Sequence, residues 1–237
     1  MTFIMMPFNP VEVLSELISI QSLSKEEEPA RILIERILEG NNINHTVDLN
    51  NVWAKNKHFD ESKYTILLNS HLDTVKPNKG YTKDPYSPII ENGKLYGLGS
   101  NDAGGALITL LGTFLHFYNE EDLPFNLVFA ASAEEEISGK NGMEYLFPRL
   151  PKIDFAIVGE PTLLDIAIAE RGLMVLDCKA IGKSGHAARK EGVNAIYEAI
   201  KDINWFNTYE FTNRSDEIGG ISMSVTVINA GSQHNVV

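Results

Sequence analysis

The chain has 237 residues, of which 43% are hydrophobic and 9% aromatic, enough to bury one sizeable core or a core plus a small second domain. Its 32 acidic residues outnumber its 20 basic ones, which argues against nucleic-acid binding because phosphate contacts need clustered Lys and Arg. No stretch approaches the roughly 20 apolar residues of a membrane span, and the N-terminus lacks the features of a secretory signal, so we expect a cytoplasmic protein without a membrane partner.

The first fifth of the chain is predicted to be helical. Asn9 is a candidate N-cap, and Pro10 follows it at the first helical position. A second helix is predicted to begin at Ser24 and to end near Gly40, because the acidic residues that follow Ser24 favour the N-terminal end of a helix dipole. Weak strands are expected around Thr46–Lys55.

Four short apolar runs farther along the chain each precede side chains that suit a divalent metal. The runs and the residues after them are Tyr64–Asn69 with His71 and Asp73, Lys94–Gly97 with Asp102, Asn126–Ala131 with Glu134–Glu136, and Phe155–Val158 with Glu160. Such runs, interrupted by Gly, Ser, Asn or Pro, predict buried strands. In an open α/β sheet, ligands bind beyond the carboxyl ends of the strands. These side chains are therefore expected to converge at one sheet edge, as a hydrolytic metal centre requires.

The spacing of His71 and Asp73 lets the carboxylate reach the imidazole ring. A histidine that binds a metal almost always donates its other N–H to such an acceptor, which fixes the tautomer. Asp102 has two interpretations that the spacing leaves open. It is either a metal ligand or the N-cap of the apolar helix predicted over Ala106–Phe117. That helix is apolar on all sides and is expected to pack under the sheet.

The three consecutive glutamates, Glu134–Glu136, also allow two interpretations. A charge run is often a solvated face or a helix N-terminus. Directly after a buried strand, however, the carboxylates crowd together and raise one another's pKa unless a cation neutralises them. A metal would relieve this repulsion and leave one carboxylate free as a general base. A set of His and carboxylate ligands suits Zn²⁺, Co²⁺ or Mn²⁺.

The pattern changes after residue 170. Leu173–Ile181 alternates apolar and polar residues, which predicts a half-exposed antiparallel strand with the lone Cys178 as a small buried residue. A helix over Val193–Ile203 and a strand over Ile221–Ile228 are expected to follow.

The alternation of strands and helices in residues 1–170 predicts an α/β domain, and residues 171–237 predict a smaller α+β domain. The residues from Gln233 onward begin the pattern of another element and stop within it, so the chain is expected to be cut short.

Five motifs together resemble the M20 metallopeptidases of the acetylornithine deacetylase and succinyl-diaminopimelate desuccinylase type. In chain order they are SHLDTV (70–75), YGLGSNDAGGAL (96–107), SAEEEISG (132–139), VGEPT (158–162) and KSGHAA (183–188). The resemblance implies a mixed-sheet, zinc-exopeptidase-like catalytic domain with helices on both faces. Part of a smaller α+β lid and dimerisation domain would follow it.

The resemblance also implies a role for each matching residue. The ligands of the first metal would be His71, Asp102 and Glu160. The second metal would share Asp102 and add Glu136. Relatives continue beyond the equivalent of residue 237 and supply a last metal-binding His, so the second metal is expected to lack that ligand here.

The catalytic roles follow from the same resemblance. Asp73 would orient His71, and Glu135 would be the general base. His186 would cross a dimer interface to stabilise the oxyanion and bind substrate. Asn235 matches a substrate-contacting Asn of the lid more loosely.

The implied function is hydrolysis of the amide bond of a small N-acyl amino acid, such as N-acetylornithine, in amino-acid biosynthesis. The attacking water would bridge two divalent ions, Zn²⁺ or Co²⁺, in a homodimer that forms through the lid. Succinyl-diaminopimelate and di- or tripeptides remain alternative substrates. The chain could instead be an inactive metal-binding or dimerising fragment, or a metal-free hydrolase with paired carboxylates.

Overall fold

The computed structural model of the chain describes residues 8–189, 191–231, 233–234 and 237. The chain divides into two units, residues 1–164 and 165–237. The boundary predicted at residue 170, with a catalytic domain before it and a lid after it, stays a prediction. No helix among the described residues is long and apolar enough to cross a membrane.

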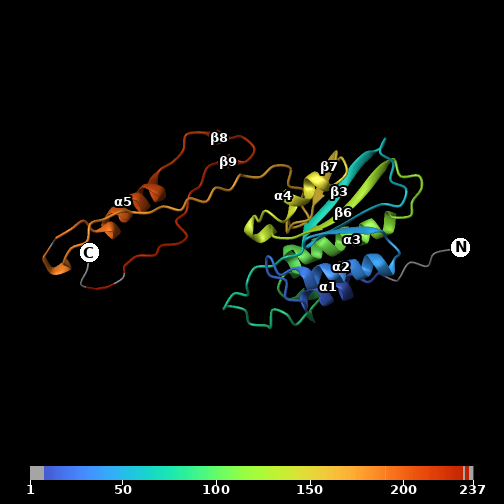
Figure 1. Cartoon of the computed structure of the whole chain (residues 1–237), viewed down its shortest axis with the longest axis horizontal. Coiled ribbons are helices and arrows are strands. Elements are labelled where there is room, and N and C mark those ends of the chain that lie inside the picture. The colour runs from blue at the N-terminus through green and yellow to red at the C-terminus, as the bar shows by residue number, and fades with distance from the viewer. Residues whose placement is uncertain (1–7, 190, 232, 235–236) are drawn as a thin grey trace. The chain divides into compact units, whose positions relative to one another are not determined.

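A mixed sheet of five strands forms the centre of the first unit, in the order β1-β2-β6-β3-β7 (Figure 1). The strands are β1 (His45–Asp48), β2 (Asn51–Lys55), β3 (Tyr64–His71), β6 (Phe125–Ser132) and β7 (Phe155–Val158). Strand β2 is antiparallel to β1 and β6, whereas β6 and β7 both run parallel to β3, which lies between them. The carboxyl ends of β3, β6 and β7 therefore lie at the same edge, where the sequence predicts the site.

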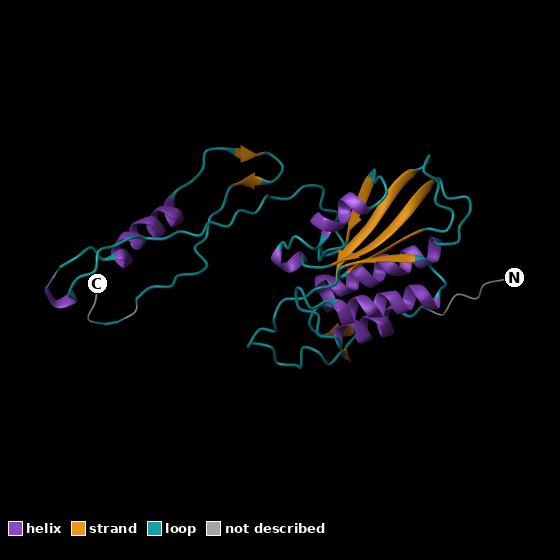
Figure 2. Ribbon diagram, in the orientation of Figure 1, coloured by secondary structure: helices purple, strands orange, loops and turns teal. Residues whose placement is uncertain are grey.

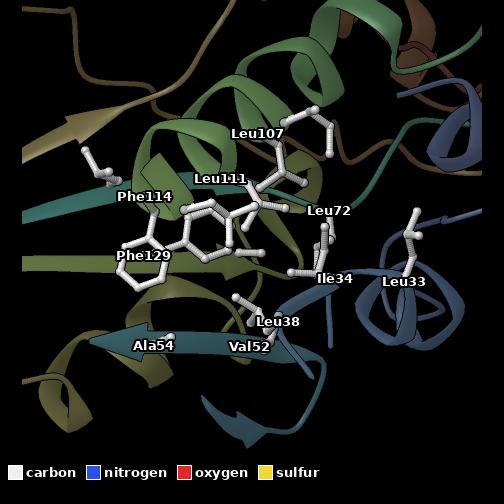
Figure 3. Close-up of a cluster of buried hydrophobic side chains, with 14 of the residues drawn as sticks. Leu33, Ile34, Leu38, Val52, Ala54, Leu72, Leu107, Leu111, Phe114 and Phe129 are labelled. Carbon is white, nitrogen blue, oxygen red and sulfur yellow. The ribbon is translucent and has the colours of Figure 1, made fainter. Parts of the chain in front are cut away.

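Three helices cover one face of this sheet: α1 (Pro10–Ile18), α2 (Glu28–Gly40) and α3 (Gly105–Phe117) (Figure 1). The core lies between them and the sheet, where Phe114 of α3 packs on Phe129 of β6 with 5.8 Å between ring centroids (Figure 3). On the other face, Leu146 of the short helix α4 (Met143–Leu146) packs against Leu67 and Val128. The predicted α/β class with helices on both faces is confirmed.

Of the two predicted helix starts, the structure confirms the first and contradicts the second. Asn9 caps α1 as predicted, because its side chain accepts hydrogen bonds from the N–H groups of Val11 and Glu12. The prediction that α2 begins at Ser24 is wrong, since α2 begins at Glu28. The Ser24 hydroxyl instead donates to a carboxylate of the site, so the residues before α2 run alongside that site.

The run Lys94–Gly97 does not belong to the main sheet, which corrects the prediction of four strands at one edge. It forms β5 (Lys94–Tyr96), which pairs with β4 (Ile89–Glu91) in a separate two-stranded sheet. The two residues between them, Asn92 and Gly93, have φ of 53° and 75°. An Asn-Gly pair with positive φ at both positions makes the tight turn that favours a local hairpin.

The second unit contains α5 (Ala195–Thr208), the turn η4 (Ala187–Arg189) and the two-residue strands β8 (Arg214–Ser215) and β9 (Gly219–Gly220). The predicted helix is therefore confirmed, but the strands predicted over 173–181 and 221–228 are wrong (Figure 2). An alternating pattern becomes a strand only when a neighbour pairs with its backbone. Neither segment pairs with a strand among the described residues, and Cys178, predicted to be buried, is exposed.

Candidate metal centre

His71, the last residue of β3, is at the centre of the site and is only 2% exposed. Its Nδ1 lies 2.9 Å from the backbone oxygen of Asp73 and 3.4 Å from the Oδ1 of the same residue. These contacts place a proton on Nδ1, so Nε2 is the nitrogen that can bind a metal once its own proton is displaced. Nε2 faces carboxylates: it lies 3.2 Å from Asp102, 3.9 Å from Glu160 and 4.0 Å from Glu135.

Asp73 is 1% exposed and connects the segment after β3 with the turn after β6. Its carboxylate accepts hydrogen bonds from the Ser24 hydroxyl at 2.7 Å and from the backbone N–H groups of Glu135 and Glu136 at 3.0 and 3.1 Å. Burial alone would raise the pKa of Asp73, but the bonds from His71, Ser24 and the two N–H groups outweigh it and lower that pKa. An ionised Asp73 therefore orients both the ring of His71 and the turn after β6.

Asp102 reaches the site by a route that does not follow the main sheet. It lies in the irregular turn η1 (Ser100–Gly104), which follows Gly99 at φ 73° and precedes α3. Its side chain points to His71, and no side chain caps the start of α3. The N-cap interpretation of Asp102 is therefore wrong.

The glutamate run splits between two environments. Glu134 has φ 55° and is only 5% exposed, and its carboxylate accepts hydrogen bonds from the backbone and side chain of Asn141. Glu135 and Glu136 instead belong to the site. Ligand atoms of His71, Asp102 and Glu136 all lie within 4.8 Å of one another, close enough for one cation to bind all three.

Glu160 follows β7 and approaches the same imidazole. The segment before it is held against β3 by the Gly159 N–H, which donates to the Asn69 oxygen at 2.7 Å, and by the Ser70 hydroxyl, which donates to the Gly159 oxygen at 2.8 Å. The structure thus brings together all the predicted residues of the first unit. The resemblance pairs His71 and Asp102 with Glu160, whereas the cluster whose ligand atoms all lie within 4.8 Å of one another contains Glu136 instead.

The charges of this cluster favour a bound cation. Burial raises the pKa of both Glu136 and Glu160, and neighbouring carboxylates, Asp102 and Glu135 among them, raise it further. Carboxylates in such a group repel one another when all are ionised. One neutral imidazole nitrogen and several carboxylate oxygens form a donor set that fits a divalent ion such as Zn²⁺, which would remove this repulsion.

The protonation of His71 gives a testable pH dependence. Burial lowers the pKa of His71, but the Asp73 hydrogen bond and the charges of Glu160, Asp73 and Glu135 outweigh it and raise the pKa to about 9. Below pH 9 the metal-free ring is therefore protonated, and a metal must displace that proton.

We expect Zn²⁺ binding at pH 7.5 to release about one proton from His71 and the affinity to rise roughly tenfold per pH unit up to pH 9. Calorimetry in buffers of different ionisation enthalpy measures the released protons. His116→Ala, on the exposed side of α3, should leave the release unchanged. A release near zero from pH 7 to 9 would contradict the raised pKa.

A cavity of about 340 Å³ opens beside the ligands. Its lining includes Asp102 and Glu136, together with Thr74, Val75 and Tyr81. The cavity places room for a small molecule against the carboxylates of the centre.

The structure gives less information on the two site residues that were predicted to belong to the lid. His186 belongs to the second unit, where its Nδ1 accepts a hydrogen bond from the N–H of Ala188 at 3.3 Å. Asn235 lies outside the described residues. Sequence reasoning did not find Ser24 as a partner of Asp73, because that contact joins residues 49 positions apart with no motif to mark it.

Comparison with known proteins bears on the same residues. The profile of peptidase family M20/M25/M40 matches residues 67–228. The LysW-lysine/LysW-ornithine hydrolase of Sulfurisphaera tokodaii is 31% identical over 95% of this chain and 59% of its own length. The acetylornithine deacetylase of Buchnera aphidicola subsp. Schizaphis graminum is 27% identical over 95% of this chain and 64% of its own length. The chain thus spans about 60% of the length of these relatives.

A solved structure shares the fold. A tripeptidase from Staphylococcus aureus subsp. aureus Mu50 superposes with a TM-score of 0.64 and 21% identity, over 98% of this chain and 64% of that one. The resemblance in five motifs, the fold and the profile match over more than half of the sequence agree. The chain belongs to peptidase family M20/M25/M40.

Proposed function

We propose that this chain provides the metal-binding part of an amidohydrolase that removes the acyl group from a small N-acyl amino acid. The observation that carries this proposal is the buried imidazole of His71, whose Nε2 faces the carboxylates of Asp102, Glu135 and Glu160. Membership in a peptidase family supports amide hydrolysis, and the adjoining cavity suits a small substrate.

The residues divide the chemistry between them. His71, Asp102, Glu136 and Glu160 would hold two divalent ions, for which we favour Zn²⁺. Bound there, such ions polarise a carbonyl group and make water more acidic. Glu135 is proposed as the general base because its side chain is 53% exposed and still lies 4.0 Å from His71 Nε2.

In the proposed reaction Glu135 accepts a proton from the attacking water, whose oxygen forms a bond to the amide carbon. Glu135 then returns that proton to the amine nitrogen as the carbon–nitrogen bond breaks. The products are a carboxylate and a free amine. Asp73 keeps the His71 ring oriented and holds the N–H of Glu135 throughout. The expected roles of His186 and Asn235 at the oxyanion and substrate stay predictions, as do the homodimer and the cytoplasmic location.

N-acetylornithine is the substrate that we favour, since two relatives have ornithine derivatives in their names. The test uses the 237-residue chain, stripped of metal and reloaded with Zn²⁺ or Co²⁺. Hydrolysis is measured with N-acetylornithine, succinyl-diaminopimelate and a tripeptide, in parallel with the metal content.

Each outcome of this assay supports one of the candidate functions. Preferred turnover of N-acetylornithine that chelation abolishes supports the proposal, whereas preference for another member of the panel corrects the substrate. Turnover that survives exhaustive chelation would favour paired carboxylates without metal. Weak binding of a single metal without any turnover would favour the inactive metal-binding fragment.

A further inference from the structure

Glu27 is a completely buried carboxyl group that the proposed reaction does not use. It occupies the N-cap position of α2 but makes no capping hydrogen bond there. Its Oε1 accepts hydrogen bonds from the N–H groups of Lys25 at 2.7 Å and Glu134 at 3.0 Å, and its Oε2 accepts one from the Asn50 side chain at 2.7 Å. In the described part of the chain it forms no ion pair. Because a buried carboxylate is costly, such a residue needs a reason to be there.

The contact with Glu134 connects Glu27 to the site. Glu134, Glu135 and Glu136 present three successive N–H groups, of which the first donates to Glu27 and the next two to Asp73. Glu134 also has the left-handed φ of 55°, which is unfavourable in a residue other than Gly. Two buried carboxylates thus accept hydrogen bonds from the backbone of the turn that carries both Glu135 and Glu136.

The segment that carries Glu27 also forms hydrogen bonds with the residues that follow β3. The Ser22 hydroxyl donates to the Leu72 oxygen at 2.9 Å, and the Thr74 N–H donates to the Ser22 oxygen at 2.7 Å. Ser24 then donates to Asp73. Residues 22–27 therefore connect the segment after β3, which carries Asp73, to the turn after β6, which carries Glu134–Glu136.

We propose that Glu27 is a positioning residue, which acts through the N–H of Glu134 to place Glu135 and Glu136 against His71. This inference rests on the proposed function for the roles of those two glutamates. Glu27 itself lies behind the turn and contacts no ligand atom of the site among its described hydrogen bonds.

Glu27→Met and Glu27→Gln separate positioning from general stability. Met has a similar length but offers no strong acceptor to the Glu134 N–H, whereas Gln keeps an oxygen that can replace Oε1 for both backbone donors. The same change at the exposed neighbour, Glu26→Met, is the matched control. The measurements are the hydrogen exchange of the Glu134 amide, the Co²⁺ absorption spectrum and affinity, and kcat and KM.

We expect Glu27→Met to speed exchange at the Glu134 amide, alter the Co²⁺ spectrum and weaken Co²⁺ binding about 10–100-fold, as loss of an outer partner does. In an active preparation kcat should fall more than KM changes. Glu27→Gln should restore most of each property, and Glu26→Met should match the wild type. Should Glu27→Met fail to fold, Glu27→Asp, whose shorter side chain withdraws the acceptor, takes its place with the same expectations.

An unchanged Glu134 amide and Co²⁺ spectrum in folded Glu27→Met would overturn the inference. So would a Gln variant as impaired as the Met variant. Because amide exchange needs neither metal nor turnover, it tests the contact even if the wild-type chain hydrolyses nothing. Failure of the proposed function is therefore distinguishable from failure of the role assigned to Glu27.

Discussion

Glu135→Gln is expected to lower kcat about 10²–10⁴-fold, the range for loss of a general base. The amide has the size of the carboxylate and leaves the N–H of Glu135 on Asp73, but it cannot take a proton from water. Metal affinity should stay within a few-fold of the wild type, because the cluster whose ligand atoms all lie within 4.8 Å of one another contains Glu136 and not Glu135. Steady-state kinetics and calorimetry on the same preparations measure the two properties.

Glu144→Gln, on an exposed position of α4, controls for the loss of one negative charge from the surface. It should leave both kcat and metal affinity unchanged. Full activity in Glu135→Gln would remove that residue from the mechanism. A collapse of metal binding together with activity would make it a ligand instead of a base.

His71→Ala should lower the affinity for Zn²⁺ by more than the roughly 100-fold that marks loss of an outer partner. The change removes the ligand atom that three carboxylates face. Asp73→Asn should cost only about 10–100-fold, because it disturbs His71 without removing it. An Asn amide cannot accept at both positions where Asp73 receives the N–H groups of Glu135 and Glu136.

Competition with a chromophoric chelator measures these affinities, and circular dichroism checks the fold. The exposed His116→Ala is the control for loss of an imidazole and should bind like the wild type. The order of effects is the informative result. If Asp73→Asn weakened binding as much as His71→Ala, the division into ligand and orienting partner would not hold.

The part of the site that the sequence could predict is the part built from consecutive residues. The runs that became β3 and β6 are almost continuously apolar and are buried, so their burial and their ends were readable. The prediction that Phe155–Val158 is buried is wrong, because β7 is exposed along its whole length. Once strands run parallel, their carboxyl ends must share an edge. This is why His71, the glutamate turn and Glu160 could be expected to meet.

The rest depends on pairings between distant residues. Because the Asn92-Gly93 turn pairs the run before Asp102 with β4 in a separate hairpin, Asp102 is positioned by the turn ahead of α3 and not by the main sheet. The alternating runs of the second unit show β propensity without a partner strand in the described residues. Propensity describes a segment, whereas a strand also needs a neighbour that the segment does not encode.

The hydrogen bonds of the centre also set the order in which it can form. Ser24 and Asp73 are 49 positions apart, and Glu27 and Glu134 are 107 positions apart. Contacts of such separation are slow to make, because the entropy of closing the loop is lost before the contact forms. A growing polypeptide on the ribosome cannot complete this centre until β6 and the turn after it have been synthesised. Capture of the cation is therefore expected to follow folding of the first unit, with the metal binding a scaffold whose core has already closed.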